Sequence, residues 1–480
     1  MGRPRLTRRP NELLAHWRAR SGMSRVQLAR AVADRARVRG LRGIHPDESR
    51  VRRWLAGEIP RDPVPVLITE VLSERLGLAL TCADLGFPTP SHPVPNDGPD
   101  LPWQSTSTID AIAYLTRSEV MLPHTRTSAD AVHVHCGDDL LGPLQMWPAA
   151  KPSALIERPG EHTVSGRIGT REVDGIRAIT SMYRDADNRF GGMLSRRAVI
   201  AQMADATAML DSCSYSEATG RALFSAVADL GSVAGWMSFD AGLHKTAQRL
   251  FITALHAANE GGDKALGAHI LQCMARQMSH LGHYEEALEL VQLAQYGARR
   301  QASPATRSML AALEARFQAI LGTLDDSERS AGQAEETFTR VLFADEPSYM
   351  AFFDEAELSA TLGVAHQIAA KHDDDATRRA RRAEKALSRL GTALSLRPEH
   401  RVRSQVFDHI GLARTHLTVG ALDGALQETA TAVSYIDTIG SKRVADRLIE
   451  LHDEAEPFAR SAEAAALRTQ IKHAVTGSVA

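Results

Sequence analysis

Glycine and alanine recur with one spacing at three places in the second half of the chain. In each place a glycine is followed by an alanine after five residues and by another after twelve: Gly242, Ala247, Ala254; Gly282, Ala287, Ala294; Gly420, Ala425, Ala432. A small residue also stands seven positions before each glycine: Gly235, Ala275 and Ala413. Small residues at such intervals allow two helices to pack closely, so this half of the chain is constrained to fold as successive helix pairs.

These intervals fit the tetratricopeptide pattern, in which each repeat is one helix pair. Tyr284 and Leu422, two residues after their glycines, also fit, and weaker copies stand at Gly322 and around Gly363. The resemblance implies about five helix pairs between residues 221 and 465, stacked as a right-handed α-solenoid. An undifferentiated helical bundle is the alternative, because alanine-rich helices produce alanine coincidences easily.

A solenoid of this kind has a concave face that forms a binding groove, lined by the first helices of its repeats. Four polar residues on those helices are candidates for contacting a peptide, a small molecule or a protein effector: Gln272, Arg276, His366 and Arg414. The alternative is that these side chains only pack one helix pair on the next.

Charge divides the chain into two parts. Residues 1–62 contain sixteen arginines, no lysine and six acidic residues, a net charge of +10. The other 418 residues contain 40 basic and 52 acidic side chains, a net charge of −12, and the whole-chain value of −2 conceals this difference. A small basic segment of this kind indicates a head that binds a polyanion, although a helical bundle with a solvated arginine face would show the same composition.

The basic segment has the pattern of short helices. A first helix from Pro10 to Gly22 is expected to bury Leu13, Leu14 and Trp17, and a second helix is expected to be capped by Ser24 and to bury Val26, Leu28, Ala29 and Val32. A third helix should start near Pro46 and Asp47, bury Val51 and Trp54, and end at Gly57. Two further helical stretches are expected, one at residues 63–77 and the other a short turn around Thr81 to Leu85.

Five such helices, with a short arginine-rich third one, resemble the lambda-repressor-like helix-turn-helix heads of bacterial transcription factors. The residues that carry this resemblance are Leu28, Ala29, Val51, Trp54 and Gly57. In that family the third helix enters the major groove of double-stranded DNA.

The resemblance implies roles for individual residues of the head. It places base contacts at Glu48, Ser49 and Arg53, phosphate or base contacts at Arg50 and Arg52, and a backbone contact at Arg25. Glu48 departs from the neutral amide that is commoner there, and can alternatively cap the helix. The N-terminal arm is expected to meet phosphates or an adjacent minor groove through four arginines: Arg3, Arg5, Arg8 and Arg9.

Six prolines between Phe87 and Pro102 predict a linker without regular structure. We therefore expect an all-α chain made of a helix-turn-helix head, a Pro-rich linker, a helical intermediate segment and a tetratricopeptide-like solenoid. The expected boundaries are 1–88, 89–107, 108–220 and 221–480.

Motifs for catalysis, cofactor binding and membrane insertion are not found in the sequence. It has no phosphate loop, HExxH, G-x-S-x-G or CxxC motif, so we expect no enzyme and no cofactor. His133, His135 and Cys136 cannot all face one ion from a regular element, so no metal site is expected. The run Asp373 to Asp375 is expected to be an exposed helix start. Four widely spaced cysteines and no apolar run of eighteen residues predict a cytoplasmic protein without a membrane segment.

Head and repeats together resemble a large group of actinobacterial transcriptional regulators, some of which restrain sporulation and antibiotic production. Stretches 214–244, 262–282 and 352–358 carry this resemblance beyond the head. It implies a nucleoid-associated regulator that forms a homodimer through its repeat body and responds to an effector. The alternative is an interaction scaffold whose basic head binds nucleic acid without sequence preference.

Overall fold

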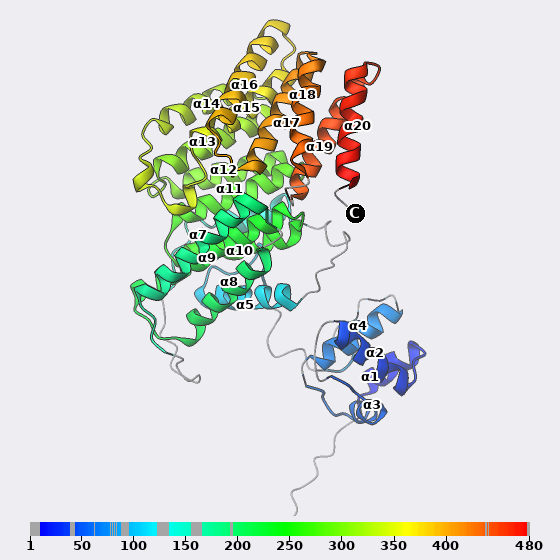
Figure 1. The fold of residues 1–480 in the computed structure, drawn as a ribbon. Helices are drawn as coiled ribbons and strands as arrows, with labels where there is room; N and C mark the ends of the chain where they lie inside the picture. The colour runs from blue at the N-terminus through cyan, green and yellow to red at the C-terminus, as the bar shows by residue number, and fades with distance from the viewer. Residues whose placement is uncertain are drawn as a thin grey trace, which may run out of the picture. The chain divides into compact units, whose positions relative to one another are not determined.

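The regular secondary structure that the computed structural model describes is helical, which confirms the expected all-α class. The described parts are residues 10–38, 44–61, 63–76, 78, 80, 82, 84–87, 96–121, 134–154, 166–192, 195–436, 439 and 441–477. Within them there is one isolated bridge, between Arg167 and Ser214, and no strand. The chain divides into two compact units, Met1–Pro95 with Arg117–Thr127, and Asn96–Thr116 with Ser128–Ala480, called here the head and the body (Figure 1).

The head contains four α-helices in its N-terminal part: α1 (Glu12–Arg20), α2 (Arg25–Val38), α3 (Glu48–Leu55) and α4 (Val64–Leu76). The expected boundaries of α2 and α3 are confirmed by their caps. Ser24 Oγ accepts a hydrogen bond from Gln27 N, and Asp47 accepts one from Arg50 N. Each cap satisfies one of the amide donors that a helix leaves unpaired at its start. The short turn expected around Thr81 to Leu85 is seen at the described residues there, which form turns and add no fifth helix.

The head has its own apolar core. It includes Leu14, Leu28, Val51 and Trp54 as expected, together with residues of α4 such as Leu67. Two expected core residues are wrong: Leu13 is 49% exposed and Val26 is 50% exposed. Successive residues of a helix point about 100° apart, so Leu13 and Leu14 cannot both face a narrow core.

The body is built from the remaining helices, which are stacked in the order of the chain (Figure 1). They are α5 (Ser105–Met121, of which 117–121 fall in the head unit), α6 (Asp138–Leu144), α7 (Thr170–Phe190), α8 (Arg196–Ser212), α9 (Glu217–Asp240), α10 (His244–Glu260), α11 (Lys264–His280), α12 (Tyr284–Ala298), α13 (Pro304–Ile320), α14 (Leu324–Phe338), α15 (Glu355–His372), α16 (Ala376–Leu396), α17 (Val402–Thr418), α18 (Leu422–Ser434), α19 (Lys442–Glu454) and α20 (Ala462–Gly477).

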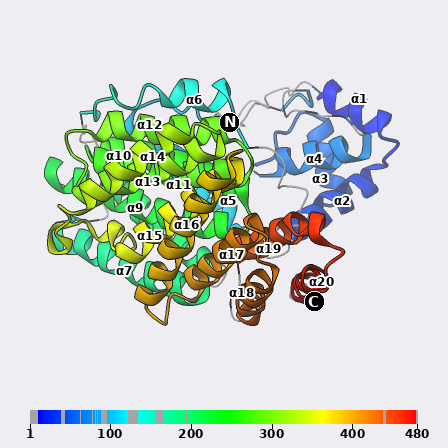
Figure 2. The same cartoon turned by 90° about the horizontal axis from the view of Figure 1, so that it is seen from above.

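From α9 to α18 the helices pack as five consecutive pairs, α9 with α10 through α17 with α18. The first helices of neighbouring pairs also contact each other, as α11, α13, α15 and α17 do in succession. Figure 2 shows the same succession from above, with α18 and α20 at one margin of the body. The chain therefore forms the helix pairs that the spacing of small residues predicts.

Four of the repeat glycines make the turn inside a pair. Gly242, Gly282, Gly322 and Gly420 have φ values of +77°, +88°, +80° and +74° and directly precede or follow helix ends. This left-handed backbone conformation is strained for residues that carry a Cβ atom, which explains why glycine recurs there.

Gly363 has a different role, so its assignment to the repeat register is wrong. It lies inside α15, where a Cβ atom would stand 2.8 Å from Leu390 Cγ of α16. The turn between α15 and α16 instead contains the acidic run. Asp373 in that run is buried rather than exposed, and it pairs with Arg378 and Arg382 at 3.0 Å.

A segment before α7, residues 134–154, crosses the repeats as a strap. Its Trp147 is fully buried at the positions where Cβ atoms of Gly267 and Gly297 would lie, so α11 and α12 need glycine there. Lys264 Nζ donates hydrogen bonds to the carbonyls of Trp147 and Ala150. The strap is therefore part of the body's core.

Helix α9 is long and apolar enough to span a membrane by length and composition. Of its most apolar window, 83% is buried inside the body, and its residues include Phe224, Val227 and Leu230 of the main core. Packing against neighbouring helices therefore accounts for its apolar character.

Candidate functional site

A cavity of about 240 Å³ opens among the first helices of the repeats. Helices α9, α11, α13, α15, α17 and α19 line it, with α7 contributing further residues. A water molecule needs roughly 10–15 Å³ of such space, so the cavity has room for a small organic molecule.

The cavity wall is rich in arginine and aromatic side chains. Its arginines are Arg184, Arg276, Arg316, Arg397, Arg401, Arg403, Arg414, Arg443 and Arg447, and its aromatic residues are Trp236, Phe239, Phe317, Tyr349, Phe352 and Phe407. Three carboxylates, Asp187, Glu357 and Asp408, also line it. This composition gives a cationic cavity with apolar surfaces.

Two of the arginines bind the helices to each other through buried ion pairs. Arg403 of α17 reaches Asp187 of α7 at 2.7 Å and Asp240 at the end of α9 at 2.9 Å. Arg397 pairs with Glu357 and with Asp408, both at 2.8 Å. Burial raises the pKa of Asp408 to about 6, against the lowering effect of Arg397. These two arginines are occupied by structural partners.

Arg316 of α13 is different. No carboxylate pairs with it among the described residues, and its Nε is buried without a hydrogen-bond partner. Burial, followed by the guanidinium groups of Arg447, Arg276, Arg414 and Arg443, lowers the pKa of Arg316 to about 9. Arg276 also has a buried donor without a partner, Nη2. Such donors are costly to leave unsatisfied, which marks this part of the wall as suited to an anion.

A cysteine and a histidine also meet at the wall, with Cys273 Sγ 3.9 Å from His269 Nε2. Burial raises the pKa of Cys273 to about 12 and lowers the pKa of His269 to about 3. A thiol with so high a pKa holds almost no thiolate at neutral pH, and the thiolate is the reactive form. The arrangement favours packing over nucleophilic chemistry.

Three of the four residues expected in a ligand groove line this cavity: Gln272, Arg276 and Arg414. His366 does not line it. Its ring is nearly buried on another side of α15, with Nδ1 3.9 Å from Glu328 of α14. His366 does lie on the first helix of its pair, as expected, but its ring faces α14 and not the cavity.

Arg316 was missed, although the sequence contains a signal for it. Arg276, Arg316 and Arg414 each stand six residues before a turn glycine, Gly282, Gly322 and Gly420 respectively. Trp236 holds the same place before Gly242. Arg443 and Arg447 of α19 reach the cavity from the end of the array, and no local spacing indicates this.

In the head, α3 presents a polar face to solvent. Val51 and Trp54 point into the core, so at 100° per residue Ser49, Arg52 and Arg53 point outward. Arg50 lies at the flank of this face and Glu48 at its N-terminal end. All the residues expected on DNA from α3, and Arg25 of α2, are exposed, whereas Arg3, Arg5, Arg8 and Arg9 lie outside the described residues.

Acidic residues lie near these arginines, at the long end of ion-pair distances. Arg50 and Arg53 lie 3.9 Å from the two carboxylate oxygens of Glu58, and Arg25 lies 3.9 Å from Glu48. Asp47 is used by the helix cap, and the hydrogen bond from Ser49 lowers its pKa. Long, exposed ion pairs of this kind contribute little, so the arginines can exchange them for phosphates.

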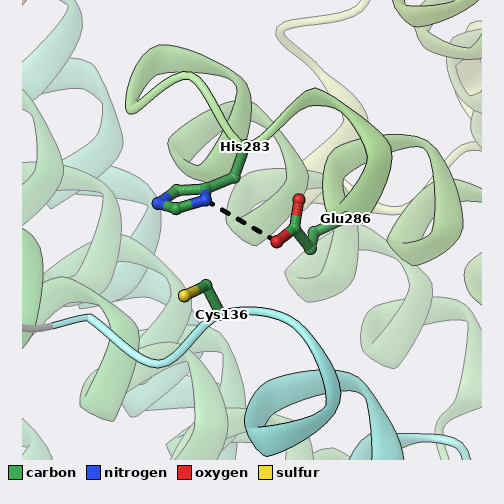
Figure 3. A group of neighbouring side chains, drawn as sticks. All are labelled: Cys136, His283 and Glu286. Atoms are coloured by element: carbon green, nitrogen blue, oxygen red, sulfur yellow. Dashed lines mark ion pairs between the residues drawn. The ribbon is translucent and has the colours of Figure 1, made fainter.

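A third group of side chains lies where the strap meets α12 (Figure 3). Cys136, His283 and Glu286 bring a thiol, an imidazole and a carboxylate within 4.8 Å of one another, a set that can hold a metal ion. Glu286 is already engaged, since it accepts a hydrogen bond from Gly137 N and lies 3.6 Å from His283. His283, the N-cap of α12, and Glu286 within α12 were missed because they lie more than 140 residues along the chain from Cys136.

His135, which is described, is not part of this group. The main chain of His135 exchanges hydrogen bonds with Gln248, and His133 lies outside the described residues.

Comparison with known families gives a match on the head. Residues 14–88 match the SP15 N-terminal domain. The matched stretch begins within α1 and includes α2, α3 and α4, so it bears on the head alone. No curated protein and no solved structure matches the chain.

Proposed function

We propose that the chain is a sequence-specific DNA-binding transcriptional regulator with a tetratricopeptide-like effector-binding body. The observation that carries the proposal is α3, a short helix fixed by Val51 and Trp54 whose outward face bears Ser49, Arg52 and Arg53. In this account α3 reads base edges in the major groove, and the exposed arginines around it contact phosphates. The net charge of +10 in residues 1–62 supports the proposal.

The body supports the second half of the proposal. Its cavity lies on the first helices of successive pairs, which is where a tetratricopeptide-like array binds its ligands. We assign this cavity a binding role and no catalytic one, because its only thiol is protonated at neutral pH. The regulator acts in the cytoplasm, on the nucleoid, in developmental or secondary-metabolic control.

Dimerisation belongs to the same proposal. One head with a single short recognition helix contacts few base pairs, and regulators of this type bind paired half-sites. We assign the pairing to the body. Light scattering on the intact chain should give the mass of a dimer, and a monomer at micromolar concentration would remove this part of the account.

DNA selection with the intact chain tests the main claim. A pool of random duplexes should yield one enriched sequence, bound at least about a thousandfold more tightly than its scrambled version. Affinity for both duplexes should fall as salt rises. Equal affinity for the two, with the same salt dependence, would instead favour a scaffold whose head binds nucleic acid non-specifically.

A further inference from the structure

Arginines from separate repeats converge on one wall of the body cavity. Arg276 of α11, Arg316 of α13 and Arg414 of α17 share the position six residues before a turn glycine, and all three line the cavity. Arg443 and Arg447 of α19 join them. A position that repeats along the array therefore places several cations around one space.

The carboxylates near these five arginines do not neutralise them. Four of them, all except Arg316, are contacted by carboxylates: Glu357, Asp240, Glu450 and Glu454. Glu357 is shared with Arg397, Asp240 with Arg403, and Glu454 with Lys371. The cavity therefore keeps an excess of positive charge, and Arg316 carries the part that no carboxylate contacts.

An aromatic surface lies next to the arginines. The guanidinium of Arg443 lies 4.7 Å from the ring centre of Trp236 and 5.1 Å from that of Phe407. Both rings are only partly buried, so each offers surface to the cavity. A flat or apolar group can occupy this surface while a charged group reaches Arg316.

We infer that the cavity binds a small organic anion, whose phosphate or carboxylate group lies on Arg276, Arg316, Arg414 and Arg447 and whose flat apolar part lies against Trp236 and Phe407. Guanidinium groups suit both anions because their planar donors match two oxygens at once. The anion satisfies the buried donors of Arg276 and Arg316. The size of the cavity fits a small molecule better than a folded partner.

The binding itself does not depend on DNA. That the anion acts as the effector rests on the proposed function, since a ligand shifts DNA affinity only by binding two states of the regulator unequally. Binding is therefore measured without DNA, so that failure of either proposal is visible separately.

The first test is thermal unfolding of the intact chain with Arg316→Met. Arg316 is partly buried, no described carboxylate pairs with it, and its Nε is buried without a partner, so its removal takes away a charge that destabilises the empty cavity. The variant should melt at a higher temperature than wild type without ligand. Arg340→Met is the matched control, because Arg340 is 68% exposed and pairs only with Glu336, and it should leave the melting temperature unchanged. A lower melting temperature for Arg316→Met would show a structural role and overturn the assignment.

The second test is calorimetric titration of the intact chain with four probes: naphthyl phosphate, naphthoate, inorganic phosphate and naphthol. At least one naphthyl anion should bind more tightly than both inorganic phosphate and uncharged naphthol. The stronger of the two naphthyl anions distinguishes a phosphate ligand from a carboxylate ligand. Arg316→Met should weaken that binding roughly 10- to 100-fold, as expected for a charged hydrogen bond, and Arg340→Met should not.

Two results would overturn the inference. One is naphthol binding as tightly as the anions, which would make the cavity an apolar site. The other is the failure of both naphthyl anions to bind at millimolar concentration in low salt.

Discussion

In the head, the side chains of Arg50 and Arg53 are 56% and 49% exposed and lie 3.9 Å from their nearest carboxylate. In the body, those of Arg397 and Arg403 are 2% and 10% exposed and hold carboxylates at 2.7 to 2.9 Å. The same residue type is available to an outside partner in one unit and committed to the fold in the other. Arg316 is the exception among the arginines that line the cavity, since no described carboxylate pairs with it.

The two groups of arginines differ in the free-energy cost of giving up their present ion pairs to bind a new anion. An exposed ion pair contributes about 0–1 kcal/mol, so exchanging it for a phosphate costs little. A buried pair has already lost its hydration, and breaking it leaves a carboxylate unpaired in the core. The exposure of an arginine side chain and its ion pairs therefore indicate whether it can bind a ligand. The amino-acid composition alone does not.

The largest effect is expected from Arg403→Met in the body. It leaves Asp187 and Asp240 without their shared partner, and breaking a buried pair in this way costs about 3–5 kcal/mol. Urea unfolding followed by circular dichroism should show this loss. Arg340→Met should change stability by less than about 0.5 kcal/mol. Equal midpoints for both variants would mean that the buried pairs do not differ from exposed ones.

The same variant should change the dependence of stability on pH. Burial alone would raise the pKa of Asp240, but Arg403 and Arg443 outweigh it and lower that pKa. The ionised Asp240 carboxylate therefore stabilises the fold above about pH 4, and this stabilisation is lost as the pH falls below that value. Without Arg403 the pKa of Asp240 should rise, so that this carboxyl group takes up a proton at a higher pH in the variant. The variant's loss of unfolding free energy, relative to wild type, should therefore be smaller at pH 5 than at pH 7. A deficit that does not change with pH would contradict the ion-pair explanation.

The second effect concerns the support of α3. Trp54→Ala removes a side chain that is only 3% exposed, and large-to-alanine changes of this kind cost about 3–5 kcal/mol. Because the head has a small core of its own, it should unfold while the body keeps its transition in calorimetry. Leu13→Ala is the control, since Leu13 is 49% exposed and its loss should change little. A head that melts normally without Trp54 would break the link between core and recognition helix.

The smallest effect is expected from Glu58→Gln. Glu58 lies near both Arg50 and Arg53, and neutralising it should change stability by only about 0–1 kcal/mol. DNA affinity should rise, because a negative charge is removed beside the phosphate-binding arginines. Gel-shift titration at low and moderate salt measures this rise, and it should be larger at low salt. Unchanged or weaker binding would show that Arg50 and Arg53 do not face DNA.

The repeat glycines show what sequence spacing can predict. A turn inside a helix pair needs a left-handed residue, so glycine recurs and the register is readable, including the arginine six positions earlier. Gly363 was wrongly assigned to a turn because glycine also occurs where two helices pack closely. Here it allows α15 to pack against Leu390 of α16. His366 is on a first helix as expected, but a polar residue there can face either side of the helix, and His366 faces Glu328 of α14.

Other features depend on contacts that no local pattern records. Arg443 reaches the cavity only because α19 packs beside α17 and α9. Cys136 meets His283 and Glu286 because the strap crosses α12. In the head, two adjacent apolar residues, Leu13 and Leu14, fit more than one helical face, and only packing decides that Leu14 is buried.

The most direct test of the account is DNA discrimination by Arg53→Ala, compared with Arg75→Ala, which removes an exposed arginine from the end of α4. Both variants lose one positive charge from the head, but only Arg53 lies on the outward face of α3. The difference in binding free energy between the selected duplex and its scrambled version should shrink by about 1–3 kcal/mol in Arg53→Ala. It should stay unchanged in Arg75→Ala. Full discrimination by Arg53→Ala, or an equal loss in both variants, would contradict sequence reading by α3.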